Sequence, residues 1–383
     1  MSTPLPWVRS HMQLLAGVEQ DFRTRRPLAG LTIATAIHLE PKTAVLLLTL
    51  QAGGAKVIAT GNLNSTQAAT VDELRHHGIE IVGQQTQAQE EHEAALDQLL
   101  SHRPHLLLDN GGDLFVRYLQ NPYAGLMGGT EETTSGRLRL APLREKLALP
   151  LLVINDSPIK QFAENEHAVG QSVLESYLRI TNRATNGQCV TVYGYGACGR
   201  GVAANFRAAH ARVTVAERDP VRRLQAHIDG YRAARPEDAL EGADVVITVT
   251  GGGQIIGGAD LARLKDGAVL LNAGHFPVEI DLPGLLVHPQ VQEVSRMEGI
   301  TTLLLRDGRQ VHVLGEGHMV NLAGPRPMGN SIESMDLGFT LQARCLEAVA
   351  AGRVGAEACV VPVPAEIDAA VADAYLDLKY PAL

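Results

Sequence analysis

The sequence predicts an α/β protein with two Rossmann-like, doubly wound domains and a C-terminal helical segment that returns to the first of them. In the first 160 residues, short apolar runs alternate with helical stretches of about 10–15 residues, which is typical of parallel βαβ units. A second block of the same kind begins at Cys189, after the turn Thr185-Asn-Gly-Gln. From Met328 to Asp377 the pattern is helical, and the simplest unthreaded path packs this tail against the first domain.

Composition and charge exclude several classes of protein. The chain has 383 residues, enough for two domains, and a net charge of −9 without a basic run, so nucleic acid and anionic membrane are poor partners. Its most apolar stretch, Ala44 to Leu50, is far shorter than the ~20 residues that a bilayer requires. The N-terminus shows no signal-peptide pattern, and the four cysteines have neither pairing nor metal-ligand spacing. We therefore expect a reduced, cytoplasmic protein with small-molecule or protein partners and no metal.

The expected elements of the first block follow in chain order. A strand within Leu31–His38 precedes a helix that Pro41 opens and that reaches about Gln51. The remaining strands are expected at Lys56–Ala59, Ile79–Val82, Leu106–Asp109 and Leu151–Ile154, and a helix should end near His77. Each strand ends in polar residues, at the sheet edge where open α/β sheets bind ligands.

The second block follows a long helix from about Glu164 to Thr181. Its expected strands begin at Cys189, Val213, Val245 and Val269, and the block extends to about Leu322.

A glycine motif at the start of this block indicates a dinucleotide site. Gly194, Gly196 and Gly199 form G-x-G-x-x-G directly after an apolar strand and at the head of a helix. The first glycine permits the tight turn, the second allows close approach to a pyrophosphate, and the third allows the helix and strand to pack closely. The next strand ends in Glu217, 21 residues after Gly196, where a carboxylate can accept hydrogen bonds from a ribose diol.

Glu217 favours NAD over NADP, because its charge would repel a 2′-phosphate. Arg218 is the counter-argument, since an arginine there can accommodate that phosphate. The next two strands end in Thr250 and in the run Asn272-Ala273-Gly274-His275. We expect both ends to line the nicotinamide side of the cofactor site. We therefore expect residues 185–325 to form an NAD-binding domain, and residues 1–180, together with 328–383, a substrate-binding domain.

Three polar clusters of the first domain are candidates for chemistry. Asp113 follows a strand, Gly129–Gly136 places acids and hydroxyls in what we expect to be a glycine-bounded loop, and Asn155–Lys160 opens a helix with Ser157 as its N-cap. Lys160 and Glu164 are then one turn apart on that helix. Taken singly, each residue favours a structural interpretation: a solvated Lys–Glu pair, a turn aspartate, or a satisfied histidine at His38 or His275.

Together with other short motifs, these clusters make the chain resemble the S-adenosyl-L-homocysteine hydrolase family from about Leu28 to Leu376. The resemblance is carried by Asn64-Ser-Thr-Gln67, Asp109-Asn-Gly-Gly-Asp-Leu114, Glu131-Glu-Thr-Thr134, Asn155-Asp-Ser157, Gly194-Tyr-Gly196, Gly274-His-Phe276, Val278-Glu-Ile-Asp281, Glu316-Gly317 and Asn321-Leu322. It implies a substrate domain, an NAD domain, tightly held NAD and a homo-oligomer, either a dimer or a tetramer. The implied reaction oxidises a ribose 3′-hydroxyl, eliminates the 5′ thiolate after loss of the C4′ proton, adds water and restores the alcohol.

The resemblance also implies roles for individual residues. Lys160 matches the lysine that helps deprotonate the 3′-hydroxyl, Glu164 replaces the family's aspartate partner, and Glu132 matches the acid that binds the ribose hydroxyls. Asp113, His38 and His275 match groups of the C4′ and C5′ proton transfers. The cofactor contacts that the resemblance implies are Thr133, Thr134, Ser135, Asn165, Glu217, Ala273, Gly274, His275 and Asn321, in addition to Gly194, Gly196, Gly199 and Thr250 expected from the motif and the strand ends.

The departures from the family pattern concern mainly the base. After His38 the family has Met-Thr-x-Glu, whereas this chain has Leu39-Glu40-Pro41-Lys42, so that a lysine replaces the glutamate that reads adenine. The family's Gly-His-Pro becomes Gly329-Asn330-Ser331. Glu40, Lys42 and Asn330 are therefore the expected specificity residues.

Three further departures lie elsewhere in the chain. After Ser-Thr-Gln, Ala68 replaces an aspartate; within the cofactor block, Arg222 replaces an asparagine; and the family's longer C-terminal tail has no counterpart here. Loss of that tail predicts weaker NAD retention and admits a smaller assembly.

The leading hypothesis is an NAD-dependent adenosylhomocysteine hydrolase-like enzyme that cleaves or forms a nucleoside 5′-thioether with altered base specificity. The alternatives are an NAD-dependent sugar or nucleoside oxidation with elimination or epimerisation, a non-catalytic NAD-sensing regulatory protein, and a plain dehydrogenase.

Overall fold

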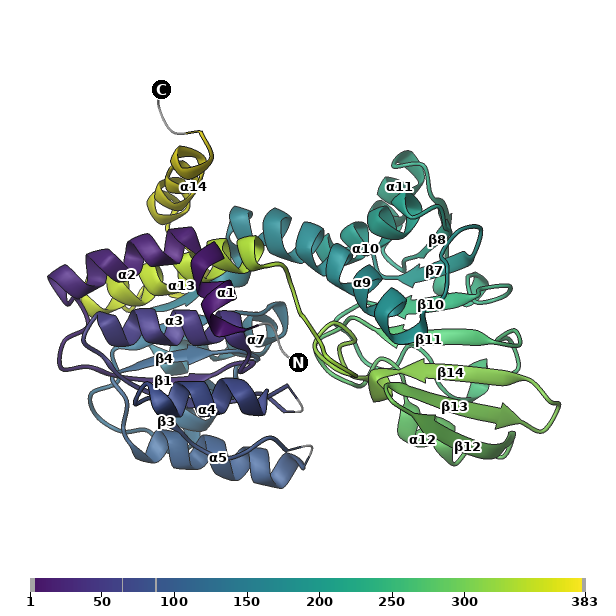
Figure 1. The fold of residues 1–383 in the computed structure, drawn as a ribbon, viewed down its shortest axis with the longest axis horizontal. Helices are drawn as coiled ribbons and strands as arrows, with labels where there is room; N and C mark the ends of the chain where they lie inside the picture. Colours follow the sequence, from purple (N-terminus) through teal and green to yellow (C-terminus); the bar gives the residue numbers. More distant parts are fainter. Residues whose placement is uncertain (1–3, 64, 87, 381–383) are drawn as a thin grey trace. The chain divides into compact units, whose positions relative to one another are not determined.

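The computed structural model describes residues 4–63, 65–86 and 88–380; Asn64, part of one string quoted above, lies outside them. The chain forms two compact units, Met1–Gln161 with Ile332–Leu383, and Phe162–Ser331. Each unit is built on one sheet (Figure 1). The predicted α/β class, with two parallel-sheet units and a C-terminal return to the first sheet, is confirmed.

The first unit contains a seven-stranded parallel sheet in the order β15-β6-β5-β4-β1-β2-β3. Its strands are β1 (Thr32–Ala36), β2 (Lys56–Thr60), β3 (Glu80–Ile81), β4 (Leu106–Asp109), β5 (Gly128–Glu131), β6 (Leu151–Val153) and β15 (Cys359–Pro362). Its helices are α1 (Leu5–His11), α2 (Gln13–Arg25), α3 (Pro41–Ala52), α4 (Ala68–His76), α5 (Gln89–Ser101), α6 (Asp113–Gln120), α7 (Thr134–Leu140), α8 (Arg144–Leu147), α13 (Ile332–Ala350) and α14 (Ala365–Lys379).

Both faces of this sheet are covered by helices, as parallel sheets require. Alternate residues such as Ala34, Leu107 and Leu151 share one core with residues of α5 and α6. Helix α13 contacts β4 and β5 and packs against α2 and α3. Figure 1 shows α2, α3 and α13 lying next to one another, so the C-terminal part of the chain is built into the first unit.

The second unit contains an eight-stranded sheet in the order β12-β13-β14-β11-β10-β7-β8-β9. The strands are β7 (Cys189–Tyr193), β8 (Arg212–Ala216), β9 (Arg232–Ala234), β10 (Val245–Thr248), β11 (Ala268–Asn272), β12 (Val291–Met297), β13 (Ile300–Leu305) and β14 (Gln310–Leu314). All pairings are parallel except β12–β13 and β13–β14. The helices are α9 (Val169–Thr181), α10 (Ala197–Ala208), α11 (Pro220–Ile228) and α12 (Leu282–Leu286). Val245 and Ile247 face one core and Val246 the other, so this sheet is also buried on both sides.

Three local expectations are wrong. Gly128–Glu131 is strand β5 rather than a loop, because its backbone is paired between β4 and β6 even though glycine has low strand propensity. The C-terminal tail is not continuously helical, since β15 separates α13 from α14 and extends the first sheet beside β6. The long helix is α-helical only from Val169, because Lys160–Ala168 forms a π-helix, a form concentrated at functional sites.

No helix in the ranges just described combines the length and apolarity needed to cross a membrane.

Candidate active site

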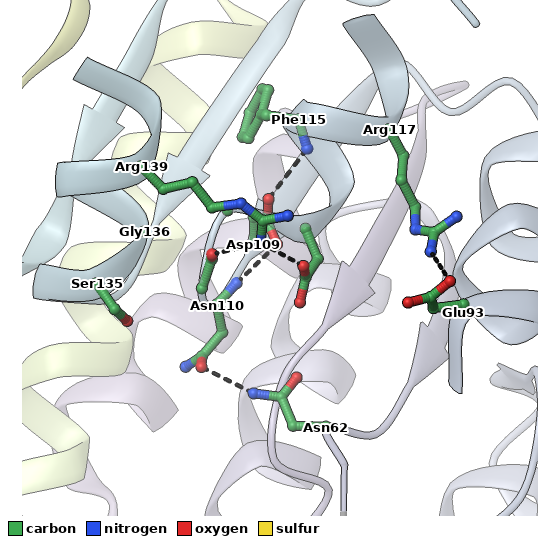
Figure 2. Close-up of polar contacts among 12 residues, drawn as sticks. Asn62, Glu93, Asp109, Asn110, Phe115, Arg117, Ser135, Gly136 and Arg139 are labelled. Carbon is green, nitrogen blue, oxygen red and sulfur yellow. Dashed lines mark hydrogen bonds and ion pairs between the residues drawn. The ribbon is translucent and has the colours of Figure 1, made fainter. Parts of the chain in front are cut away.

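The first unit gathers predicted site residues at the carboxyl ends of β4 and β5. Strand β4 ends in Asp109 and strand β5 in Glu131, and the loops that follow carry Asp113, and Glu132 with Thr133. The backbone N–H of Phe115 donates to Asp109, and the side chain of Asn62 donates to that of Asn110 at 2.8 Å. Figure 2 marks both hydrogen bonds. This edge is the one at which open α/β sheets bind ligands.

Glu131 organises both loops with a fully buried carboxylate. Its oxygens accept backbone N–H groups of Gly111 and Gly112 at 3.0 Å and of Thr133 at 2.7 Å. Burial raises the pKa of Glu131 to about 7, and the backbone donors oppose that rise. Helix α7 then starts at an N-cap formed by the Thr133 hydroxyl, which accepts the N–H of Gly136 at 2.9 Å.

The central pair of this unit is Lys160 and Glu132, each about 5% exposed. Lys160 Nζ donates to Glu132 Oε1 at 2.5 Å. The predicted cap is confirmed, because Ser157 Oγ accepts the backbone N–H of Lys160 at 3.3 Å. A buried lysine held against a buried carboxylate is suited to proton transfer.

Asp113 and His38 are each anchored by a polar side chain. Asp113 is the first residue of α6, where the helix N-terminus favours a carboxylate, and Arg139 Nη1 donates to its Oδ1 at 2.5 Å. His38 places Nδ1 2.6 Å from the hydroxyl of Ser65, and its carbonyl accepts the hydroxyl of Thr43. Both side chains therefore hold defined orientations.

The predicted hydroxyl residues after β5 form a linked set. Thr133 Oγ1 lies 3.0 Å from Ser135 Oγ, and Thr134 Oγ1 donates to Asn155 Oδ1 at 2.9 Å. The set thereby joins the loop after β5 to the segment after β6.

Glu40 and Lys42 form a buried ion pair at the start of α3. Lys42 Nζ lies 2.9 Å from Glu40 Oε2, and both side chains are less than a tenth exposed. Glu40 is also the N-cap of α3 and accepts the backbone N–H of Lys42. A carboxylate only accepts hydrogen bonds and an ammonium only donates them, so the pair presents one acceptor and one donor side by side.

The second unit contains a dinucleotide cradle at the glycine motif. Gly194 has φ +103°, and a Cβ there would lie 2.7 Å from the carbonyl oxygen of Val249. A Cβ on Gly199 would lie 2.1 Å from the carbonyl oxygen of Gly194, whereas one on Gly196 would meet only Arg222 Nη1, at 3.9 Å. The space above Gly196, at the N-terminus of α10, therefore fits a pyrophosphate.

Two further groups of this unit fit NAD. The buried carboxylate of Glu217 stands at the end of β8, where it accepts the N–H groups of Tyr195 at 2.8 Å and Asp219 at 2.9 Å. Asn321 Oδ1 is buried without a hydrogen-bond partner among the residues that the structure describes, and a polar ligand group would satisfy it.

The loops after β10 and β11 are held together by Glu279. Its carboxylate accepts the N–H groups of Thr250 at 2.9 Å and Gly251 at 2.8 Å, and burial raises its pKa. The side chain of Asn272 bonds to both N–H and C=O of Gly274 and thereby orders the run that contains the buried Ala273 and the half-buried His275.

A second cluster of this unit joins predicted residues from distant parts of the chain. Asn321 Nδ2 donates to Ser172 Oγ at 3.0 Å, and Ser172 Oγ donates to Asn330 Oδ1 at 3.1 Å. Asn330 Nδ2 lies 3.5 Å from Glu164 Oε1. The predicted residue Asn165, which follows Glu164 in the sequence, is also buried.

Sequence reasoning missed four residues that hold these groups: Glu131, Glu279, Ser172 and Gln342. Gln342 of α13 donates from Nε2 to Glu132 Oε2, 210 residues earlier. Glu131 and Glu279 lie within motifs that carry the family resemblance, so their position in those motifs could have identified them. Ser172 and Gln342 lie on ordinary helical faces and gave none. Within the described ranges, no group of three or more His, Cys, Asp or Glu residues could hold a metal ion.

Comparison with protein families gives matches in both units. The model of "S-adenosyl-L-homocysteine hydrolase" matches residues 7–124, and that of "S-adenosyl-L-homocysteine hydrolase, NAD binding domain" matches residues 165–326.

Individual relatives are similar over almost the whole chain. The S-inosyl-L-homocysteine hydrolase of Methanopyrus kandleri is 38% identical over 380 residues, covering 97% of this chain and 89% of that protein. The S-inosyl-L-homocysteine hydrolase of Methanothermobacter thermautotrophicus is 38% identical over 382 residues, with coverage of 97% and 90%. The adenosylhomocysteinase of Thermotoga maritima is also 38% identical, over 377 residues, with coverage of 97% and 93%.

Proposed function

The chain belongs to the S-adenosyl-L-homocysteine hydrolase family, and on that basis we propose that it cleaves, or in reverse forms, the 5′-thioether of a nucleoside whose base is a 6-oxopurine such as hypoxanthine. The chain is an adenosylhomocysteinase-like hydrolase with an NAD-binding domain. The observation that carries the reaction is the buried pair of Lys160 and Glu132.

In this proposal, each residue of the first unit handles a proton or a hydroxyl. Lys160 Nζ accepts the proton of the ribose 3′-hydroxyl, and Glu132 accepts hydrogen bonds from the ribose hydroxyls. Asp113, oriented by Arg139, and His38, oriented by Ser65, serve the proton transfers at C4′ and C5′ together with His275. These roles use the contacts described above, with geometry suited to general acid–base catalysis.

The cofactor would be held by Gly194, Gly196, Gly199, Glu217 and Asn321, with Thr133, Thr134, Ser135, Asn165, Thr250, Ala273 and Gly274 as further contacts. When bound, NAD supplies reversible oxidation of the ribose 3′ carbon. Glu164 and Asn330, joined to Asn321 through Ser172, would keep the nicotinamide side of the second unit ordered.

The base assignment depends on the pair of Glu40 and Lys42. Adenine offers an N–H₂ donor at C6 and an acceptor at N1, whereas hypoxanthine offers an oxygen acceptor at C6 and an N1–H donor. The lysine stands where the family's glutamate accepts the adenine amino group, so its ammonium matches an oxygen at C6, and Glu40 matches N1–H. Two relatives named for S-inosyl-L-homocysteine support this base.

The proposal also includes an oligomeric state and a cellular compartment. A homo-oligomer, either a dimer or a tetramer, is supported by exposed apolar side chains on α14, such as Leu376 and Leu378, beside a cavity of about 730 Å³ between α2, α13 and α14. A cytoplasmic location is supported by four cysteines in the free state.

The proposed reaction and base preference are tested by comparing two nucleosides in two assays. NAD-loaded protein is incubated with inosine and with adenosine, and reduced-nicotinamide absorbance and C4′ deuterium exchange from heavy water are followed. We expect both signals with inosine and rates about 30-fold or more lower with adenosine, because adenine would place a donor against the Lys42 ammonium at a cost of about 2–5 kcal/mol. Equal rates for the two nucleosides would contradict the base assignment.

A pair of variants tests the role of Lys160, and the assay products distinguish the proposed reaction from the alternative reactions. Lys160→Ala should abolish nicotinamide reduction, whereas Lys146→Ala, which removes an exposed lysine of α8, should leave it unchanged. Reduction without C4′ exchange would indicate a dehydrogenase, and thiol release from S-inosyl-L-homocysteine without formation of inosine would indicate elimination without water addition.

A further inference from the structure

The side chain of Gln342 contacts the buried carboxylate of Glu132 at the oxygen that Lys160 does not hold. Gln342 Nε2 donates to Glu132 Oε2, while Lys160 Nζ donates to Oε1 at 2.5 Å. The three side chains come from three parts of the first unit: Gln342 from α13, Glu132 from the loop that follows β5, and Lys160 from the segment after β6. Each oxygen of the Glu132 carboxylate thus accepts a different donor. Gln342 comes from the C-terminal helix α13, and Lys160 comes from the N-terminal part of the first unit.

The orientation of the Gln342 amide is determined by this contact. Gln342 is fully buried, and its Oε1 has no hydrogen-bond partner among the described residues. Rotating the amide by half a turn would place its oxygen against the carboxylate of Glu132, where two acceptors repel each other. A buried unpaired carbonyl lowers the stability of the fold. The contribution of Gln342 is therefore its donor to Glu132.

We infer that Gln342 is a positioning residue for the oxidation half-reaction, where its amide N–H holds Glu132 so that Lys160 can accept the proton of the ribose 3′-hydroxyl. The inference rests on the proposed function. In that step the O–H bond breaks and an N–H bond forms on Lys160 Nζ. The oxygen's electron pair would become the second bond of the 3′ carbonyl, and bound NAD would supply the acceptor for the C3′ hydrogen and its electron pair.

The physical effect of the amide is on the proton held between Lys160 and Glu132. The state that can accept a proton has neutral Lys160 beside ionised Glu132, and a donor to Glu132 stabilises that state. Without the donor, that state is less favourable, so we expect the oxidation step to require a higher pH.

Two other titratable groups of the first unit interact with Glu132. Glu131, the last residue of β5, lies next to it, and the Glu132 charge helps to raise the pKa of Glu131. Cys345 of α13 is also near Glu132, although burial is the main cause of the raised pKa of that thiol. Both groups remain in the variants proposed below, so any change isolates the amide.

The experiment compares Gln342→Met, Gln342→Glu and the matched control Thr340→Val. Thr340 is on the same helix, and its hydroxyl is also buried without a hydrogen-bond partner among the described residues, but it lines the cavity beside α2 and α14. The pH dependence of nicotinamide reduction by inosine is measured on NAD-loaded protein, and the thermal midpoint is measured on the same samples without nucleoside.

We expect Gln342→Met to raise the pH midpoint of reduction by about one unit, so that the rate below the midpoint falls about tenfold. Its thermal midpoint should stay close to that of the wild type, because removal of the unpaired Oε1 offsets part of the cost of losing the donor to Glu132. Gln342→Glu should raise the pH midpoint further, because a second carboxylate then faces Glu132, and Thr340→Val should leave it unchanged.

A wild-type pH midpoint in both Gln342 variants would overturn the inference, as would a lowered thermal midpoint with an unchanged pH profile, which indicates a purely structural role. Absence of nicotinamide reduction in the wild type with every nucleoside would instead contradict the proposed function, so the two failures are distinguishable.

Discussion

Asp109 and Glu131 lie opposite each other on the neighbouring parallel strands β4 and β5, with both carboxyl groups fully buried. Burial raises the pKa of Asp109 well above its usual range, and the charge of Glu131 adds to that rise. Asp109 accepts the N–H of Phe115 in α6 while Glu131 accepts N–H groups from both loops. The two carboxyl groups thus order the segments that follow β4 and β5 and lead to Asp113 and Glu132.

Gly136→Ala should disturb this arrangement. A Cβ at Gly136 would lie 2.1 Å from Glu131 Cδ, so the carboxylate has to move and release the N–H groups that it holds. We expect a loss of about 1–3 kcal/mol in the free energy of unfolding, typical of overpacking, and at least a tenfold loss of nicotinamide reduction. Urea unfolding and the reduction assay measure the two effects.

The matched control is Gly17→Ala in α2, where a Cβ meets no atom within 4 Å. This exchange should stabilise the protein by about 0.5–1 kcal/mol, because alanine is the better helix former. If the two variants behaved alike, steric contact with Glu131 would not be the cause.

Lys42→Gln should remove the preference between nucleosides. A glutamine amide both donates and accepts, so it can face either an oxygen or an amino group at C6 of the base. We expect the ratio of inosine to adenosine exchange rates to fall from about 30 or more toward 1. Lys56→Gln, which removes an exposed lysine paired with Glu80 at 3.2 Å, is the control and should keep the wild-type ratio. An unchanged ratio in Lys42→Gln would remove Lys42 from base recognition.

Glu217→Gln should weaken discrimination against NADP. The exchange removes the negative charge that opposes a 2′-phosphate, while Arg218 and Arg222 remain nearby. We expect the ratio of NADP to NAD dissociation constants to fall about tenfold, corresponding to about 1.4 kcal/mol. Calorimetric titration with each dinucleotide measures the ratio. Glu241→Gln, at an exposed position, should leave it unaltered, and a wild-type ratio in Glu217→Gln would refute the assignment.

Asp336 makes the stability of the first unit depend on pH. Its carboxylate accepts the N–H groups of Leu14 and Leu15 at 2.9 Å, and burial raises its pKa to about 6 from 3.8. Because the folded state binds this proton more tightly than the unfolded state, the contribution of Asp336 falls as the pH rises from about 4 to about 6. The shift of about two units corresponds to about 3 kcal/mol.

Asp336→Asn provides the measurement, since asparagine does not titrate. Urea unfolding at pH 4, 5, 6 and 7 should show the variant gaining about 3 kcal/mol relative to the wild type across this range, on top of a constant offset for the lost acceptor. Parallel stability profiles for the two proteins would show that Asp336 does not bind its proton more tightly in the folded state.

Local chemistry in the sequence is enough to predict much of this protein. Pro41 opens α3, Leu106–Asp109 forms β4, and Ser157 caps the helix that carries Lys160, because the residues of each segment already favour that structure. The glycine motif and Glu217 likewise identify the dinucleotide cradle, since the turn, the helix start and the following strand lie within one βαβ unit.

The remaining features depend on contacts between distant parts of the chain. Gly128–Glu131 has poor strand propensity and becomes β5 only because β4 and β6 pair with it, and β15 forms within a helical pattern because β6 provides an edge. Gln342 meets Glu132 across 210 residues, and no local pattern records that meeting. Periodicity and turn residues describe a segment's own preferences, whereas the partners of a buried polar group are decided only when the folded chain brings them together.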